Sequence, residues 1–162
     1  GFGMVGAAHT LDMEKEEQML QLLVVTPTQL CKCCLRDTYK RGSGKILNVA
    51  SVGAFQPGPY TASYYASKSY LYQYSQAIRL EAKKQGVQVC TLCPGSTRTH
   101  FFEKTGAKTP IWAMSPERVA KEAWEGLNAD KAVVVPGMIN RLLRLVPAQI
   151  KAYGVALLKK HT

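Results

Sequence analysis

The distribution of apolar residues along the chain predicts strands that alternate with helices. Two short runs rich in apolar and β-branched residues, 46–50 and 87–92, are typical of buried strands, and 132–135 predicts a third short one. Between these runs the apolar residues recur at helical spacing. Because strands alternate with helices over short links, the pattern predicts an α/β fold with a doubly wound parallel sheet.

The first helical stretch contains a proline. Thr10 is a suitable N-cap, and acidic residues follow it where the helix dipole favours them. The apolar stripe continues past Pro27, which we expect to interrupt the helix. Proline has no N–H, so the carbonyl of Leu23, four residues earlier, loses its helical donor.

Two further helices have clear boundaries. One begins at 61–63, after a loop rich in glycine and proline, and ends at Gly86. The other begins at Ser115, with Pro116 at its first position, and runs to about Leu127.

The last segment, 138–162, predicts two basic helical pieces that Pro147 separates. After Asp130 the chain carries no acid, and apolar residues alternate with six basic ones: Lys131, Arg141, Arg144, Lys151, Lys159 and Lys160. This composition fits an amphipathic segment at a membrane surface. A solvated rim of a dimer or a lid over a substrate would show the same pattern.

Composition narrows the classes of protein further. The 162 residues are 46% hydrophobic and 20% charged, which suits one globular domain. We expect no membrane span and no signal peptide. Five cysteines without a pairing pattern or metal-ligand spacing indicate free thiols, no metal site and a cytoplasmic location. The net charge of +10 is compatible with a nucleic acid, a membrane surface or a phosphate-bearing cofactor.

The candidate chemistry lies around the first strand. Tyr64 and Lys68 are four residues apart on the following helix, so their side chains share one face. An ammonium group beside a phenol is expected to lower the pKa of that phenol. Ser51, at the end of the strand, could donate a hydrogen bond to a carbonyl oxygen in the same space. Tyr65 is the alternative to Tyr64, because it also faces Lys68.

These residues carry a resemblance to a known family. Tyr64-x-x-x-Lys68, with Ser51 thirteen positions before the tyrosine, is similar to the signature of the short-chain dehydrogenases/reductases. The strand at 87–92 leads into Pro94-Gly95-Ser96-Thr97-Arg98-Thr99, which resembles the family's Pro-Gly-x-x-x-Thr. The resemblance covers nearly the whole chain, most strongly residues 42–106.

The resemblance implies a Rossmann-like fold of which this chain forms the C-terminal part. Gly1 looks like the last residue of the family's Asn-Asn-Ala-Gly motif. Residues 1–162 would then be a single partial domain, and the glycine-rich nucleotide loop would lie upstream. The pattern Gly1-x-Gly3-x-x-Gly6 does not replace that loop, because no strand precedes it.

The resemblance also implies an activity: hydride transfer between NAD or NADP and an apolar alcohol or carbonyl substrate. Tyr64 would act as acid or base, Lys68 would tune it and hold the ribose, and Ser51 would bind the substrate oxygen. The implied cofactor-binding residues are Gly1, Tyr64, Lys68, Pro94, Gly95, Thr97 and Thr99, and candidates for an apolar substrate wall are Phe55, Tyr60 and Phe101. The implied assembly is a homo-oligomer without nucleic acid.

One position departs from the family pattern. Leu23 stands where the family carries an asparagine on the long helix. An impaired member that acts as a binding scaffold is therefore an alternative to an active enzyme. A peripheral membrane protein, bound weakly through its basic tail, is a second alternative.

Overall fold

Three parallel strands form the sheet of this protein. The computed structural model describes residues 1–101 and 109–159, so Phe102, Gly106 and Lys160 lie outside the described residues. The strand order is β1-β2-β3, with β1 at Gly44–Val49, β2 at Val87–Leu92 and β3 at Val133–Val134. The predicted strands are present; β1 begins and ends slightly earlier than expected, and β3 is shorter.

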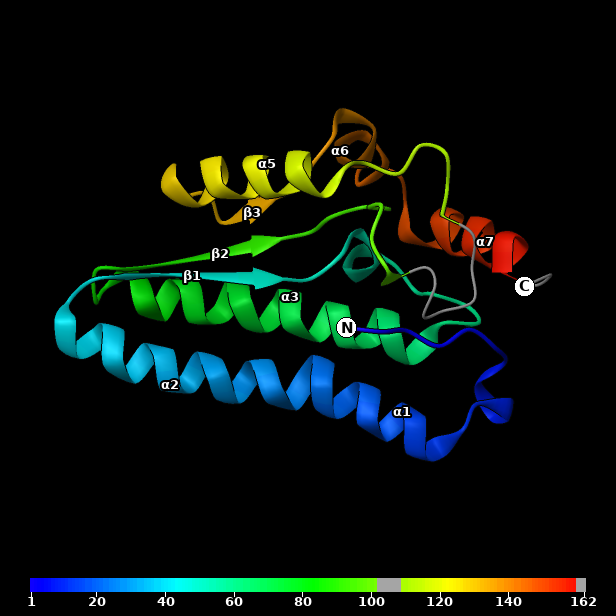
Figure 1. The fold of residues 1–162 in the computed structure, drawn as a ribbon, viewed down its shortest axis with the longest axis horizontal. Helices are drawn as coiled ribbons and strands as arrows, with labels where there is room; N and C mark the ends of the chain where they lie inside the picture. Colours follow the sequence, from blue (N-terminus) through cyan, green and yellow to red (C-terminus); the bar gives the residue numbers. More distant parts are fainter. Residues whose placement is uncertain (102–108, 160–162) are drawn as a thin grey trace.

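Helices cover both faces of the sheet, as Figure 1 shows. Helices α2 (Thr26–Arg41) and α3 (Ala62–Lys83) lie on one face, and α5 (Pro116–Asn128) lies on the other. A separate apolar cluster fills each side: Cys31, Leu35, Ile46, Ile78, Ala82, Val87 and Val89 under α2 and α3, and Cys90, Leu92, Val119, Ala123, Leu127 and Val134 under α5. The doubly wound α/β prediction is confirmed.

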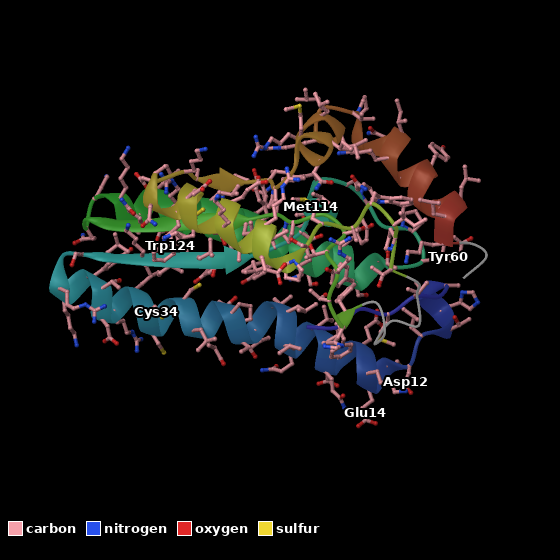
Figure 2. All side chains as sticks on the ribbon, turned by 45° about the horizontal axis from the view of Figure 1, so that its top comes forward. Asp12, Glu14, Cys34, Tyr60, Met114 and Trp124 are labelled. Atoms are coloured by element: carbon pink, nitrogen blue, oxygen red, sulfur yellow. The ribbon has the colours of Figure 1, made fainter. Side chains whose placement is uncertain are left out.

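The first helix begins later than predicted. Thr10 belongs to a short 3-10 turn, η1 (Ala8–Thr10), and α1 spans Met13–Leu20. The N-cap is Asp12, whose carboxylate accepts a hydrogen bond from the Lys15 N–H at 2.8 Å. The Thr10 prediction was wrong because Asp12 offers a charged cap nearer the apolar stripe. Figure 2 shows Asp12 and Glu14 at this end of the molecule.

Pro27 distorts the long helix without ending it. Between α1 and α2 the chain forms a π-helical segment, η2 (Gln21–Val25), and Pro27 lies in the first turn of α2. A wider turn at this point accommodates a residue that cannot donate the α-helical hydrogen bond. Leu23 lies within η2 and is buried.

The carboxyl ends of β1 and β2 are joined by hydrogen bonds that continue past the strands. The register runs from Gly44 opposite Val87 to Val49 opposite Leu92. Beyond it, the Ala50 N–H donates to the Leu92 carbonyl at 2.8 Å and the Val52 N–H donates to the Pro94 carbonyl at 3.0 Å. The two loops that hold the candidate residues are therefore in direct contact.

The C-terminal segment folds into α6 (Met138–Leu143) and α7 (Ala148–Lys159), with Pro147 between them as predicted. Neither helix contains a buried residue. The Ser115 cap of α5 is also confirmed, since its hydroxyl accepts from the Arg118 N–H. Among the described residues, no helix has both the length and the apolar character needed to cross a bilayer.

Candidate active site

Ser51 and Tyr64 meet at the carboxyl end of β1. Ser51 caps a 3-10 turn, η3 (Val52–Phe55), and its hydroxyl accepts a hydrogen bond from the Gly53 N–H at 3.1 Å. The same hydroxyl is close enough to the phenol of Tyr64 to lower the pKa of that phenol. A serine at a strand end and a tyrosine on the next helix therefore form one polar pair, as their spacing predicted.

Lys68 lies one turn further along α3 and points at the end of β1. Its Nζ donates a hydrogen bond to the Val49 carbonyl at 2.9 Å. The same atom lies 5.9 Å from the centre of the Tyr64 ring. The lysine is thus held at the ring of the tyrosine by a strand carbonyl.

The predicted lowering of the tyrosine pKa is wrong for this structure. Burial raises the pKa of Tyr64 to about 12, and the nearby Ser51 hydroxyl only partly opposes that rise. Burial also lowers the pKa of Lys68 to about 8. The physical reason is that the ammonium is aimed at the Val49 carbonyl, so the cost of desolvating the phenolate dominates.

Tyr65, the alternative to Tyr64, supports the loop that carries Ser51. Its ring lies against the backbone at two glycines: a Cβ added to Gly58 would be 2.2 Å from the ring, and one added to Gly53 would be 3.2 Å away. Its ring also forms an edge contact with Tyr64, with centroids 6.0 Å apart. The geometry therefore favours Tyr64 as the reacting tyrosine and gives Tyr65 a packing role.

The turn after β2 forms the opposite side of the site. The Thr97 hydroxyl donates to the Gly95 carbonyl at 3.1 Å, and Thr97 also bridges to Met114. A Cβ added to Gly95 would lie 2.6 Å from the amide of Asn140, which donates to the Pro136 carbonyl at 2.7 Å. Met114 lies beside α6 in Figure 2. At Gly95 a larger residue would displace the Asn140 side chain from its present position.

The N-terminal segment runs along the same site. A Cβ added to Gly3 would be 3.3 Å from the rings of both Tyr64 and Phe101. A Cβ added to Gly1 would be 3.2 Å from the Leu23 side chain. The structure therefore brings Gly1 and Leu23 together beside the candidate residues, although the sequence separates them by a helix.

The candidate residues and parts of the three segments around them line one cavity of about 860 Å³ with mostly apolar walls. The sequence-predicted residues that line it are Gly1, Ser51, Tyr64, Lys68, Pro94, Gly95, Thr97 and Thr99. Phe101 also lines it, with its ring 5.5 Å from that of Tyr64. Phe55 instead packs against Tyr72, with ring centroids 5.1 Å apart, and Tyr60 is outside the wall.

Sequence reasoning missed several residues of the wall. Val119, Ala120 and Trp124 reach it from α5, and Lys159 reaches it from α7. No local motif marks these positions, because they approach from elements remote in sequence. The amphipathic pattern of α5 does show that one side of that helix is covered.

The cations of the basic tail (residues 138–159) are not arranged as in a helix that lies on a membrane surface. Arg141 pairs with Glu122 at 2.9 Å, Arg144 stacks on Phe55 at 4.8 Å, and Lys151 donates to the Phe55 carbonyl at 3.4 Å. These cations are directed toward the body of the protein. Large apolar side chains are also exposed: Met138, Ile139, Leu142, Leu143, Leu145, Ile150, Tyr153, Leu157 and Leu158.

Comparison with known proteins agrees with this geometry. The family model for short chain dehydrogenase matches residues 1–110 of the chain, which is more than half of it. This chain therefore belongs to the short-chain dehydrogenase/reductase family.

The relatives it resembles are oxidoreductases. The uncharacterized oxidoreductase YbbO of Escherichia coli (strain K12) is 26% identical over 93% of this chain and 62% of its own length. The 7beta-hydroxysteroid dehydrogenase of Clostridium sardiniense is 28% identical over 85% of this chain and 53% of its own length. The chain thus spans only part of the relatives it matches.

Solved structures show the same fold. A short-chain dehydrogenase from Sphingobium yanoikuyae in complex with NADPH superposes with a TM-score of 0.82 at 24% identity. The superposition covers 95% of this chain and 62% of that one. The likeness confirms a Rossmann-like arrangement for the described strands and helices.

Proposed function

We propose that this chain carries the catalytic residues of an NAD(P)-dependent oxidoreductase that interconverts an alcohol and a carbonyl compound. The observation that carries the proposal is the convergence of Ser51, Tyr64 and Lys68 on one apolar cavity. A hydroxyl donor, a phenol and an ammonium group at the end of a parallel strand suit proton transfer to a substrate oxygen.

The residues around the cavity fit a nicotinamide cofactor. Gly1, Gly95 and Pro94 expose backbone at the carboxyl edge of the sheet, and Thr97 and Thr99 add hydroxyl groups. Ligands of open α/β sheets bind at this edge. The Sphingobium relative is described in complex with NADPH, and a reductase of the same fold from Brucella melitensis with NADH. When bound, the cofactor supplies or accepts the hydride.

Each catalytic side chain has a separate role in carbonyl reduction. Tyr64, whose pKa is raised to about 12, is protonated at neutral pH and gives its proton to the carbonyl oxygen. Ser51 donates a hydrogen bond to that oxygen while it gains charge. Lys68 carries a positive charge beside the phenolate that forms, and it would also bind the cofactor ribose. In the oxidative direction the Tyr64 phenolate accepts the proton of the alcohol, and Lys68 stabilises that phenolate.

The substrate side of the cavity favours an apolar compound. Met4, Val5, Val52 and Phe101 contribute apolar surface near Tyr64. An apolar wall binds hydrocarbon through the area that it removes from water. We infer a bulky secondary alcohol or its ketone as the substrate class.

The test compares two neighbouring tyrosines. With NADH or NADPH and a panel of apolar ketones, Tyr64→Phe is expected to lower kcat/KM by about 10²–10⁴, because proton transfer is lost. Tyr65→Phe retains the ring that packs on Gly58 and is expected to change kcat/KM by less than about threefold. Equal activity in Tyr64→Phe and wild type would contradict the proposal.

A second candidate function, that of a catalytically impaired binding scaffold, is suggested by Leu23. This buried leucine lines the cavity at the position of the family's asparagine, so an apolar group replaces a polar one beside the site. An impaired member would still bind the cofactor and act as a scaffold. Binding of NADPH without turnover of any ketone, and without rescue by Leu23→Asn, would favour this candidate over the enzyme.

A further inference from the structure

Helix α7 carries two lysines on the side that faces the body of the protein. Its half-buried residues include Lys151, Val155 and Lys159, which recur every four residues, together with Ala152 and Ala156. The opposite side exposes apolar residues, with Tyr153, Leu157 and Leu158 about three-quarters accessible at 76%, 74% and 75%. Two lysines therefore share the inner side of α7 with small apolar residues.

Lys159 ends this inner side at the catalytic cavity. It is half-buried, it lines the cavity, and no ion pair or hydrogen bond connects it to another described residue. A cation against apolar surface is costly unless an opposite charge accompanies it. Lys151, on the same side, already has a partner in the Phe55 carbonyl.

The remaining wall offers no partner for this charge. Among the described residues that line the cavity there is no aspartate and no glutamate. The other lysine in the wall, Lys68, is already hydrogen-bonded to the Val49 carbonyl. Among its described residues, the wall thus combines apolar surface, the candidate tyrosine and a lysine, Lys159, for which no ion pair is present.

We propose that the substrate is an amphipathic acid. Its apolar body fills the cavity, its carbonyl or hydroxyl group reaches Tyr64, and its carboxylate pairs with Lys159. This inference rests on the proposed function for the reacting group, but it concerns a different residue and a different part of the ligand. The phosphate of a cofactor offers similar chemistry to Lys159, so the test must separate the two.

The test uses the full-length protein and a matched pair of ligands: 10-oxoundecanoic acid and its methyl ester. Wild type is expected to favour the acid in kcat/KM by about tenfold or more, which is the typical effect of a hydrogen bond to a charged group. Lys159→Met should reduce that ratio to about one, and Lys159→Arg should restore it. Lys151→Met, a control from the same side of α7, should keep the wild-type ratio.

Three results would overturn the inference. One is the same acid-to-ester ratio in wild type and Lys159→Met. Another is a Lys159→Met effect on the KM for NADPH with no effect on the ratio, which would assign the lysine to the cofactor. The third is a ratio that Lys151→Met abolishes as fully as Lys159→Met does, since this would indicate a general charge effect.

A binding measurement separates this inference from the proposed function. Undecanoate has the same chain and carboxylate but no carbonyl to reduce, so its calorimetric titration does not require turnover. It should bind wild type about tenfold more tightly than Lys159→Met. If neither ketone turns over while undecanoate binding still depends on Lys159, the proposed function fails and the acid site stands. If undecanoate binds both proteins equally, the acid site is wrong whatever the activity.

Discussion

The segment with the candidate catalytic residues (residues 44–68, called the catalytic unit below) and the C-terminal unit (residues 138–159) use the same kinds of residue in opposite ways. In the catalytic unit, backbone hydrogen bonds and glycine contacts fix the loop after β1, and Lys68 is held by a carbonyl. In the C-terminal unit no helical residue is buried, and large apolar side chains face outward. The pattern of apolar and basic residues in a segment therefore does not predict which side chains are exposed. That depends on which other elements cover the segment.

The difference has a physical origin in how each unit is covered. The loop after β1 lies between β2 and α3, so every polar group there must find a partner. Helix α7 touches the body along only one side, and that side borders a cavity. Lys159 can extend toward the cavity because the long stem of a lysine packs while its charged end seeks polar groups.

The largest effect that we expect is the pH dependence of kcat/KM, which depends on the charge of Lys68. Its pKa is lowered to about 8, so below pH 8 it is charged and above pH 8 it becomes neutral. Loss of the charge removes the stabilisation of the Tyr64 phenolate that forms during reduction. We expect kcat/KM for ketone reduction to be flat below about pH 8 and to fall about tenfold per pH unit above it.

The control for this prediction is Lys68→Arg. A guanidinium stays charged throughout the accessible pH range, so the fall should move beyond about pH 10. A wild-type profile that stays flat to pH 10 would show that the charge of Lys68 is not needed. The family role that we assign to this residue would then be wrong.

A pair of glycine substitutions tests the two units with one chemical change. Gly58→Ala places a methyl group 2.2 Å from the Tyr65 ring, and we expect about 1–3 kcal/mol of destabilisation. Gly154, within α7, has no neighbour within 4 Å, so Gly154→Ala should stabilise by about 0.4–1 kcal/mol. Denaturant unfolding measures both. Equal changes at the two sites would remove the contrast between the units.

The sequence predicted most of what depends on neighbours along the chain. Local pattern and short spacing predict the alternation of strands and helices and the helix cap at Ser115. They also predict that Ser51 and Tyr64 lie close together. The Thr10 cap failed because Asp12, two residues on, was the stronger competitor. The lining role of Lys159 could not be predicted, because it depends on how α7 docks against a remote loop.

The tyrosine pKa shows a second limit of sequence reasoning. Four-residue spacing placed Lys68 beside Tyr64, as expected. It did not reveal that the Val49 carbonyl would take the ammonium, or that burial would outweigh the charge. Spacing predicts which groups meet, whereas the sign of a pKa shift depends on the surrounding solvation.

Pro27 gives a smaller test, at the border of the catalytic unit. Pro27→Ala supplies the N–H that an α-helix would donate to the Leu23 carbonyl, so the π-helical turn at Gln21–Val25 should tighten. Leu23 lines the cavity, and we expect kcat to fall several-fold, on the order of 1 kcal/mol in the activation barrier.

Leu23→Asn is the companion variant and should raise kcat, because it returns a polar group to the same place. The helix change itself is measurable by amide exchange at residues 21–27, independently of activity. Unchanged kcat in Pro27→Ala, with Tyr64→Phe inactive, would show that the helix distortion does not contribute to catalysis.

The smallest expected effect lies on the outer side of α7. Leu157 and Leu158 are 74% and 75% exposed, so replacing both with glutamine removes little buried area. We expect the free energy of unfolding to change by less than about 0.5 kcal/mol per residue. Leu71, which is 4% exposed, is the matched control, and Leu71→Ala should cost about 2–5 kcal/mol. A large loss from the Leu157 and Leu158 pair would mean that another surface covers them in solution.

The same double variant tests the membrane alternative. The tail cations Arg141, Arg144 and Lys151 are engaged with the body of the protein, so any partition onto vesicles should come from the leucines and be equal for neutral and anionic lipid. A preference for anionic vesicles that disappears in high salt would instead require these cations to leave their partners, and would overturn the arrangement described for α6 and α7.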